Sequence, residues 1–181
     1  MTGLAREPGP APTIRLAGHL DVPVLQAIAA AAYQHYLPRI GRPPAPMTAD
    51  YAAIVARGQA WLASEWTGAV PPTSAAQPTG AAPPPSGSGV QAAGLIVLVP
   101  ADSYLLLENV AVVPSAQGRG IGAALLRFAE DRAHSLGLSE IRLYTNAAMT
   151  ENLAYYPRHG YRETGRREAD GFSRVFFAKR I

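Results

Sequence analysis

Apolar and polar positions follow two spacings along the chain, and together they predict an ordered series of strands and helices. Apolar residues at every second position, or in short unbroken runs, predict strands over 13–16, 60–65, 91–99, 104–113, 140–145, 161–166 and 172–179. Apolar residues three and four positions apart predict helices over 22–37, 49–57, 121–136 and 150–159, the first two capped by Asp21 and Thr48. Because a helix separates the strands over 104–113 and 140–145, we expect these two to run parallel.

This series predicts an α/β (α+β) fold with a mixed central sheet of about seven strands and about four helices. The runs over 91–99 and 104–113 are almost continuously apolar, which indicates strands covered on both faces. We expect one domain over 13–181, after a disordered tail over 1–12, with a flexible insertion rich in proline, alanine and glycine at about 67–89. Three prolines over 39–46 predict an extended loop that either walls a substrate cleft or only connects two helices.

Composition narrows the classes of function. The chain has 181 residues, 48% of them apolar, yet no apolar run suits a membrane span and the first residues lack a signal-peptide pattern. We therefore expect a cytoplasmic protein without a membrane partner. With no cysteine and four isolated histidines, we expect no metal site. The net charge of +3 is scattered along the chain, which suits an anionic cofactor better than nucleic acid.

A glycine-rich turn joins the strand over 104–113 to the helix that follows it. It reads Gln117-Gly118-Arg119-Gly120-Ile121-Gly122. Glycines leave the backbone amides open to a ligand, and the first amides of the helix lack internal partners. Such a turn is typical of a site for phosphate oxygens.

Two classes of ligand use a turn of this kind. Gly118, Gly120 and Ala123 formally satisfy the dinucleotide pattern G-x-G-x-x-G/A, which would indicate an oxidoreductase. That pattern requires a strand running directly into the glycines and an acidic residue closing the next strand. Here Pro114 ends the strand early and Asn146 closes the next one, so we set the dinucleotide interpretation aside.

Gln117, Gly120 and Gly122 instead resemble the Q/R-x-x-G-x-G/A signature of the GNAT superfamily, the acetyl-CoA-dependent N-acetyltransferases. The segments NVAVVP and QGRGIG are similar to the central motif of that family, and LYTN with ENLAYYPRHGY is similar to its C-terminal motif. The resemblance implies a GNAT fold whose sheet splays between the fourth and fifth strands. It implies transfer of an acetyl group from acetyl-CoA to a primary amine by direct attack in a ternary complex. The alternative is a catalytically silent acyl-CoA-binding regulatory module.

The resemblance also implies a set of residues that bind acetyl-CoA. The backbone of 110–112 would pair with the pantetheine arm, which requires the fourth and fifth strands to separate after Val112, with a bulge near that residue. The amides of 117–123 would hold the pyrophosphate, and Arg119 would add charge. The implied residues are Val110, Ala111, Val112, Gln117, Gly118, Arg119, Gly120, Ile121, Gly122, Ala123, Asn146, Asn152 and Tyr156.

Two residues are catalytic candidates. Tyr156 aligns with the tyrosine of the family that lies near the sulfur and is usually assigned as general acid; otherwise it is a core aromatic residue. Glu108 lies within an apolar run on the same strand as Val110, where burial would raise its pKa toward that of a useful base. Two alternatives to Glu108 as base stay open. Glu108 pairs with an arginine as part of the structure, or a water relays the proton and no dedicated base is needed.

The residues that would face the acceptor in this family are Tyr33, Tyr36, Arg39 and Tyr51. They are aromatic and of mixed charge, so they fit an amine on a small molecule and an amine on a peptide equally well. Family members often dimerise, so a homodimer is compatible with the resemblance, although no interface is apparent in the sequence.

Overall fold

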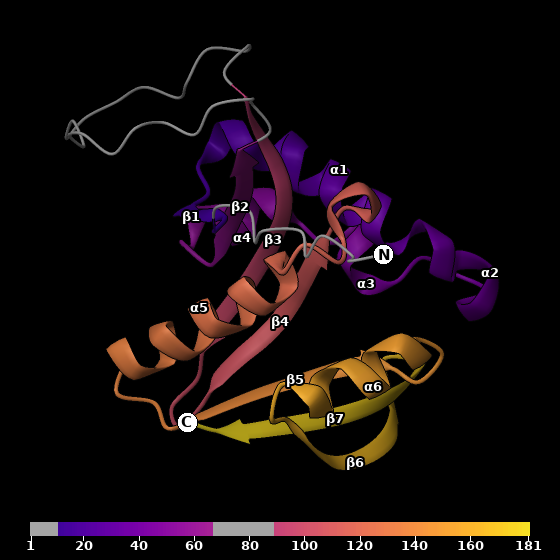
Figure 1. Ribbon diagram of the computed structural model, residues 1–181. Helices are drawn as coiled ribbons and strands as arrows, with labels where there is room; N and C mark the ends of the chain where they lie inside the picture. Colours follow the sequence, from indigo (N-terminus) through magenta and orange to yellow (C-terminus); the bar gives the residue numbers. More distant parts are fainter. Residues whose placement is uncertain (1–10, 67–88) are drawn as a thin grey trace, which may run out of the picture.

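The computed structural model describes residues 11–66 and 89–181, which form a single seven-stranded sheet with helices on both faces (Figure 1). The strand order is β1-β2-β3-β4-β5-β7-β6, and only β4 and β5 are parallel neighbours. The strands are β1 Thr13–Leu16, β2 Ala60–Trp66, β3 Val90–Pro100, β4 Leu105–Val112, β5 Glu140–Asn146, β6 Arg162–Ala169 and β7 Phe172–Arg180. The expected tail over 1–12 and insertion over 67–89 fall almost wholly outside the described residues.

The longer helices are α1 Val22–Tyr33, α4 Tyr51–Ala56, α5 Ile121–Ser135 and α6 Thr150–Arg158. Shorter helical segments are η1 His19–Asp21, η2 Gln34–Tyr36, α2 Leu37–Ile40, α3 Ala45–Thr48 and η3 Pro114–Ala116. The mixed α/β class and the seven strands are as the sequence predicts. In the part of the chain described, no helix combines the length and the apolar character needed to cross a bilayer.

Two hydrophobic layers enclose the sheet, and the alternation of side chains along β3 assigns residues to each. Leu95 and Val97 pack with α1 and α4, while Ile96 and Leu98 pack with α5 on the opposite face. All four side chains are buried, as the apolar run over 91–99 predicts. The sheet therefore has a helical layer on each side. The central strands contribute buried side chains to both layers.

The sheet opens between β4 and β5, whose pairing covers only the residues from Leu105 to Leu107. Beyond Leu107 the two strands diverge, which Figure 1 shows as a wedge between them. The expected separation after Val112, with a bulge near it, is wrong in position. The bulge is at Glu108, because Leu98 pairs with Leu107 and Val97 with Asn109. A bulge adds twist to a strand, so the divergence begins where the extra residue stands.

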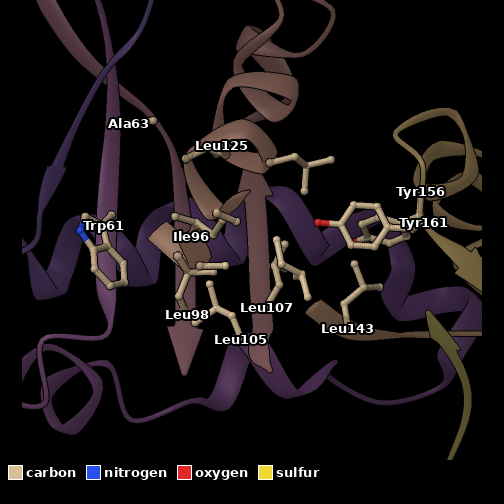
Figure 2. Close-up of a cluster of buried hydrophobic side chains, with 14 of the residues drawn as sticks. Trp61, Ala63, Ile96, Leu98, Leu105, Leu107, Leu125, Leu143, Tyr156 and Tyr161 are labelled. Atoms are coloured by element: carbon tan, nitrogen blue, oxygen red, sulfur yellow. The ribbon is translucent and has the colours of Figure 1, made fainter. Parts of the chain in front are cut away.

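Helix α6 packs on the C-terminal half of the sheet, β5-β7-β6, and contributes Tyr156 to the core. Tyr156 and Tyr161 lie beside Leu107 and Leu143, where the two halves meet (Figure 2). The turn between β6 and β7 lies at Asp170 and Gly171, and both residues have the positive φ that tight hairpin turns favour. The core thus continues across the line where the sheet opens.

Several local expectations are corrected. The carboxylate of Asp21 does not cap α1; it accepts from the Gly18 amide at 2.8 Å and pairs with Arg15 at 2.7 Å. Asp50, not Thr48, caps α4 by accepting from the Ala53 amide at 3.0 Å.

The segment over 39–46 is not a continuous extended loop. It runs through the end of α2 and the start of α3, and Pro46 stands in the first turn of α3. The first turn of a helix tolerates proline because its amides have no internal partner there. Prolines that we interpreted as fixing an extended path therefore also start short helices.

Candidate functional site

Two cavities lie on either side of the opening in the sheet. The first, which we call the glycine-turn cavity, has a volume of about 570 Å³ and lies between β4, the glycine turn and α6. The second, the α4 cavity, has a volume of about 610 Å³ and lies between α3, α4, β4 and the β5 and β7 strands. Both are lined by Tyr33, Val110, Asn152 and Tyr156. These four residues separate the two cavities, and we call them the shared wall.

The glycine turn presents backbone amides to the first cavity. Gly120 has a φ of +84° and stands at the N-cap of α5, a conformation that side chains with a Cβ rarely adopt. The first intrahelical bond is donated by the Ala124 amide to the Gly120 carbonyl, so the amides of 121–123 have no such partner. The amide side chain of Gln117 donates to the Val112 carbonyl at 3.2 Å and ties the turn to β4. This arrangement suits an anionic group at the start of α5.

The end of β4 presents an open strand edge to the same cavity. Val110, Ala111 and Val112 pair with β3 on one side only, opposite Ile96, Leu95 and Gly94. Their other edge faces the divergence from β5 and lines the glycine-turn cavity. An edge of this kind can pair with an extended ligand through backbone hydrogen bonds.

A buried hydrogen-bond network supports the shared wall from the side of α1 and α4. The Tyr33 hydroxyl lies 2.7 Å from Asn109 Oδ1 and 3.2 Å from the Val110 carbonyl. Asn109 donates to the Tyr51 hydroxyl at 3.0 Å, and Tyr51 donates to the Pro46 carbonyl at 3.0 Å. Burial raises the pKa of Tyr51 to about 12 and raises that of Tyr33 well above its ordinary value. The network holds β4 just past its bulge in a fixed position.

Tyr156 projects from α6 to the junction of the cavities. Its side chain is 6% exposed, and burial raises its pKa above the ordinary value, so the hydroxyl stays protonated. Its hydroxyl has no hydrogen-bond partner within residues 11–66 and 89–181. Asn152, one turn earlier, donates to Thr145 Oγ1 on β5 at 3.0 Å and fixes the start of α6.

Glu108, the bulged residue, lies in the α4 cavity with an exposed side chain. Its expected burial within the apolar run is therefore wrong. Its negative charge contributes to raising the pKa values of Tyr51 and Tyr144, after burial of those two rings. Among the described residues Glu108 forms no ion pair.

The opposite side of the α4 cavity carries a positive group. Arg174 stacks over the Tyr144 ring at 4.3 Å and pairs with Asp170 at 2.8 Å. Both Tyr144 and Arg174 line the cavity. The α4 cavity therefore combines aromatic walls with the carboxylates of Asp50 and Glu108 and the guanidinium groups of Arg57 and Arg174.

Of the residues expected to bind the cofactor, all but two line the glycine-turn cavity. Arg119 lies outside it and pairs with Glu65 at 3.3 Å. Asn146 lines the α4 cavity, and its side-chain oxygen accepts from the Ala148 amide at 2.9 Å.

The four residues expected to face the acceptor are divided between the two spaces. Tyr51 lines the α4 cavity and Tyr33 lines both, whereas Tyr36 lines the glycine-turn cavity. Arg39 lines neither; it pairs at 2.7 Å with Glu151 of α6, which does line the glycine-turn cavity.

Sequence reasoning did not single out Asn109 or Tyr155, and it included Arg42 only as part of the segment over 39–46. Asn109 stands beside Glu108 in an apolar run, which is a signal for a buried and paired polar group. Tyr155 precedes Tyr156 and lines the glycine-turn cavity. Arg42 stacks over Phe172 at 3.5 Å and donates to the carbonyls of 170 and 171, contacts that no local pattern indicates. No cluster of side chains suited to a metal ion occurs in the described parts of the chain.

Residues 87–163 match the family model described as an acetyltransferase (GNAT) domain. An IAA acetyltransferase from Azospirillum brasilense is 32% identical over 76 residues, which are 42% of this chain and 50% of that protein. The match therefore spans half the length of this curated relative.

Solved structures with the same fold cover nearly the whole chain. A GCN5-related N-acetyltransferase from Rhodopseudomonas palustris has a TM-score of 0.67 at 17% identity, covering 98% of this chain and 100% of that one. The PaiA N-acetyltransferase of Thermoplasma acidophilum, solved with coenzyme A, has a TM-score of 0.67 at 16% identity over 95% and 100%. The ribosomal-protein-S18-alanine N-acetyltransferase of Escherichia coli has a TM-score of 0.62 at 20% identity over 94% of each chain. At these identities the likeness establishes the fold.

Proposed function

Because residues 87–163 match the GNAT acetyltransferase domain and the fold is that of solved N-acetyltransferases, we propose that the protein is an N-acetyltransferase that moves the acetyl group of acetyl-CoA to a primary amine. The observation that carries this proposal is the shared wall, where two cavities meet at Tyr33, Val110, Asn152 and Tyr156. A donor in one cavity and an acceptor in the other would meet there directly. Bound acetyl-CoA supplies an activated thioester, and the remaining tasks fall to the residues of this chain.

The glycine-turn cavity fits the donor in three respects. Its helix N-terminus offers unpaired amides to a diphosphate, with Gly118 and Gly120 both at positive φ. Its open β4 edge, 110–112, offers backbone groups to the amide-bearing pantetheine arm. Tyr156 also lines it, and the sulfur would lie beside the hydroxyl of this residue. Asn152 and the amides of 117–123 complete the donor site.

Tyr156 is the proposed general acid. Since burial raises its pKa, the hydroxyl keeps its hydrogen at any pH at which the protein works, and that hydrogen is free of other acceptors among the described residues. Donation to the departing sulfur, as a full proton transfer or as a hydrogen bond, stabilises the leaving group.

Glu108 is the proposed general base. An alkyl amine has a pKa of about 10.4, so nearly all of it is protonated at neutral pH and must lose a proton before it attacks. The carboxylate stands exposed in the α4 cavity at the point where β4 leaves β5, without an arginine partner in the described residues. That freedom supports its role as base, directly or through a water, over a purely structural ion pair.

The α4 cavity is the proposed acceptor site, with an amine on a small molecule or a peptide as its ligand. Tyr33, Tyr51 and Tyr144 form aromatic walls, while Glu108 attracts the ammonium group of the incoming amine. The network through Asn109 keeps the Tyr33 and Tyr51 side chains in place.

Release of free thiol tests the proposal. We would mix the purified protein with acetyl-CoA and a panel of polyamines, amino acids, aminoglycosides and short peptides. We expect turnover with at least one amine, and a loss of at least about tenfold in Tyr156→Phe with unchanged CoA affinity. Tyr161→Phe is the matched control, because its buried hydroxyl has no partner and it lines neither cavity.

Two outcomes would contradict the proposal. Equal turnover of Tyr156→Phe and Tyr161→Phe would remove Tyr156 from the chemistry. Tight binding of acetyl-CoA with no thiol released by any amine of the panel would favour the acyl-CoA-binding regulatory module.

A further inference from the structure

Tyr155 and Tyr156 are neighbours on α6 with different surroundings. Tyr156 is buried in the core at the shared wall, whereas Tyr155 is only half-buried and lines the glycine-turn cavity. The Tyr155 ring meets the Tyr156 ring edge-on at 5.8 Å and lies 4.4 Å from the His159 ring on its other side. These two contacts hold the ring in one orientation.

The Tyr155 hydroxyl lies against the first turn of α5. A Cβ added at Gly122 would come within 2.6 Å of that hydroxyl oxygen, too close for any real Cβ contact. Gly122 is an ordinary helical residue, so its backbone alone would accept alanine. The glycine at 122 is therefore required by the tyrosine at 155, across the cavity.

The surroundings of the hydroxyl favour an anionic partner. Within the described residues this hydroxyl has no hydrogen-bond partner. It stands at the helix turn whose amides, 121–123, lack intrahelical acceptors. The positive charge of Arg127 lies near enough to lower its pKa, against a larger rise caused by burial. The nearest acid of the cavity wall, Glu151, is engaged by Arg39.

We propose that the Tyr155 hydroxyl donates a hydrogen bond to a phosphate oxygen of the CoA diphosphate, beside the amides at the start of α5. This inference rests on the proposed function, since it takes the glycine-turn cavity as the CoA site. Tyr155 is thereby a positioning residue of the donor, and the pair Tyr155 and Gly122 sets the width of the diphosphate site.

Calorimetric titration of the full chain with CoA tests this inference, using Tyr155→Phe, Gly122→Ala and the double variant. Because hydrogen bonds to charged groups are stronger than those between neutral groups, Tyr155→Phe should weaken CoA binding by about tenfold or more. Thermal unfolding of the free protein should stay unchanged, because the phenylalanine ring keeps both ring contacts. Tyr104→Phe, outside both cavities, is the control and should bind CoA like the parent.

The steric coupling gives an independent readout. Gly122→Ala alone should weaken CoA binding further than Tyr155→Phe does, because the new methyl group displaces the hydroxyl. In the Tyr155→Phe background the same substitution should cost little, since the overlapping atom is gone.

The outcomes separate this inference from the function on which it rests. A parent protein that does not bind CoA would overturn the proposed function itself. A parent that binds CoA, with Tyr155→Phe binding equally well, would overturn the contact alone. If Gly122→Ala weakened CoA binding by the same factor in the parent protein and in the Tyr155→Phe variant, the steric coupling would be overturned.

Discussion

Glu108 and Asn109 are adjacent polar residues in one apolar run, and the bulge directs them to different places. Glu108 is the residue left without a partner on β3, and it stands exposed in the α4 cavity. Asn109 pairs with Val97 of β3 and is 6% exposed. Its side chain forms hydrogen bonds with the Tyr33 and Tyr51 hydroxyls. Without the bulge the side-chain alternation would be different, so one inserted position decides which of the two polar side chains is exposed in the cavity and which is buried.

Substitution of Glu108 by glutamine should lower the rate at neutral pH and matter less as the pH rises. The amide cannot take a proton, but an amine with a pKa of about 10.4 loses its own proton increasingly between about pH 8 and 10. The ratio of parent to variant kcat/KM should therefore shrink with pH, while CoA affinity stays constant. A constant ratio across that range, or no loss at neutral pH, would argue against Glu108 as base.

At the scale of elements, the pattern of apolar positions is enough to predict every strand and each of the longer helices. Alternation and helical spacing follow from which face is buried, and both are local in the sequence. The end of the β4 and β5 pairing was misplaced because a bulge depends on the partner strand, which no local pattern describes. The cap of α4 was misassigned because Thr48 and Asp50 are both good capping residues, and tertiary packing selected the second.

In the candidate site, too, features that are local in the sequence could be predicted and contacts between distant elements could not. The glycine turn stands between β4 and the start of α5, as the apolar pattern predicts, because a turn between consecutive elements is local. The positions of Tyr36, Arg39 and Arg119 depend on contacts between distant elements, such as the pairs of Arg39 with Glu151 and Arg119 with Glu65. Such contacts have no signature in sequence spacing.

Arg42 joins the segment between α2 and α3 to the β6–β7 turn, and this link should matter only for the acceptor. It stacks over Phe172 and donates to the Asp170 carbonyl, beside the α4 cavity that Pro44 and Phe172 line. In Arg42→Ala we expect the KM for the amine to rise several-fold, about 3- to 10-fold, with the calorimetric Kd for CoA unchanged.

Arg166→Ala is the matched control for that substitution. Arg166 is an exposed arginine of β6 paired with Glu163, and it lines neither the glycine-turn cavity nor the α4 cavity. A rise in the Kd for CoA in Arg42→Ala, or equal effects of the two substitutions on the amine, would contradict a role confined to the acceptor cavity.

At the scale of the whole molecule, tyrosines join the two halves of the split sheet. Tyr33 and Tyr51 pack from α1 and α4, and Tyr156 and Tyr161 from α6 and the chain after it. Burial raises the pKa of all four. The opening between β4 and β5 is therefore bounded by phenol groups that resist ionisation.

Stability should fall steeply at alkaline pH for this reason. Tyrosine in the unfolded chain ionises near pH 10, while these four keep their protons in the folded state, so the unfolded state binds fewer protons above that pH. The free energy of unfolding should then decline by up to about 1.4 kcal/mol per pH unit for each tyrosine. Lysine would titrate in the same range, but Lys179 is the only one in the sequence.

Urea unfolding followed at a series of pH values measures this decline. We expect a constant free energy of unfolding between about pH 7 and 9 and a progressive fall above about pH 10, with phenolate absorbance rising as the protein unfolds. If all eight tyrosines of a protein that remains folded titrated with a midpoint near pH 10, the rings would not be buried as described.

The central claim is that the donor and the acceptor meet at the shared wall of the two cavities. Initial rates, measured with acetyl-CoA and the best amine of the panel both varied, test it most directly. Direct transfer in a ternary complex predicts reciprocal plots that intersect, and no acetylated protein after incubation with acetyl-CoA alone. Parallel plots, together with protein that gains one acetyl group without amine present, would contradict the account by placing a covalent enzyme intermediate between two separate half-reactions.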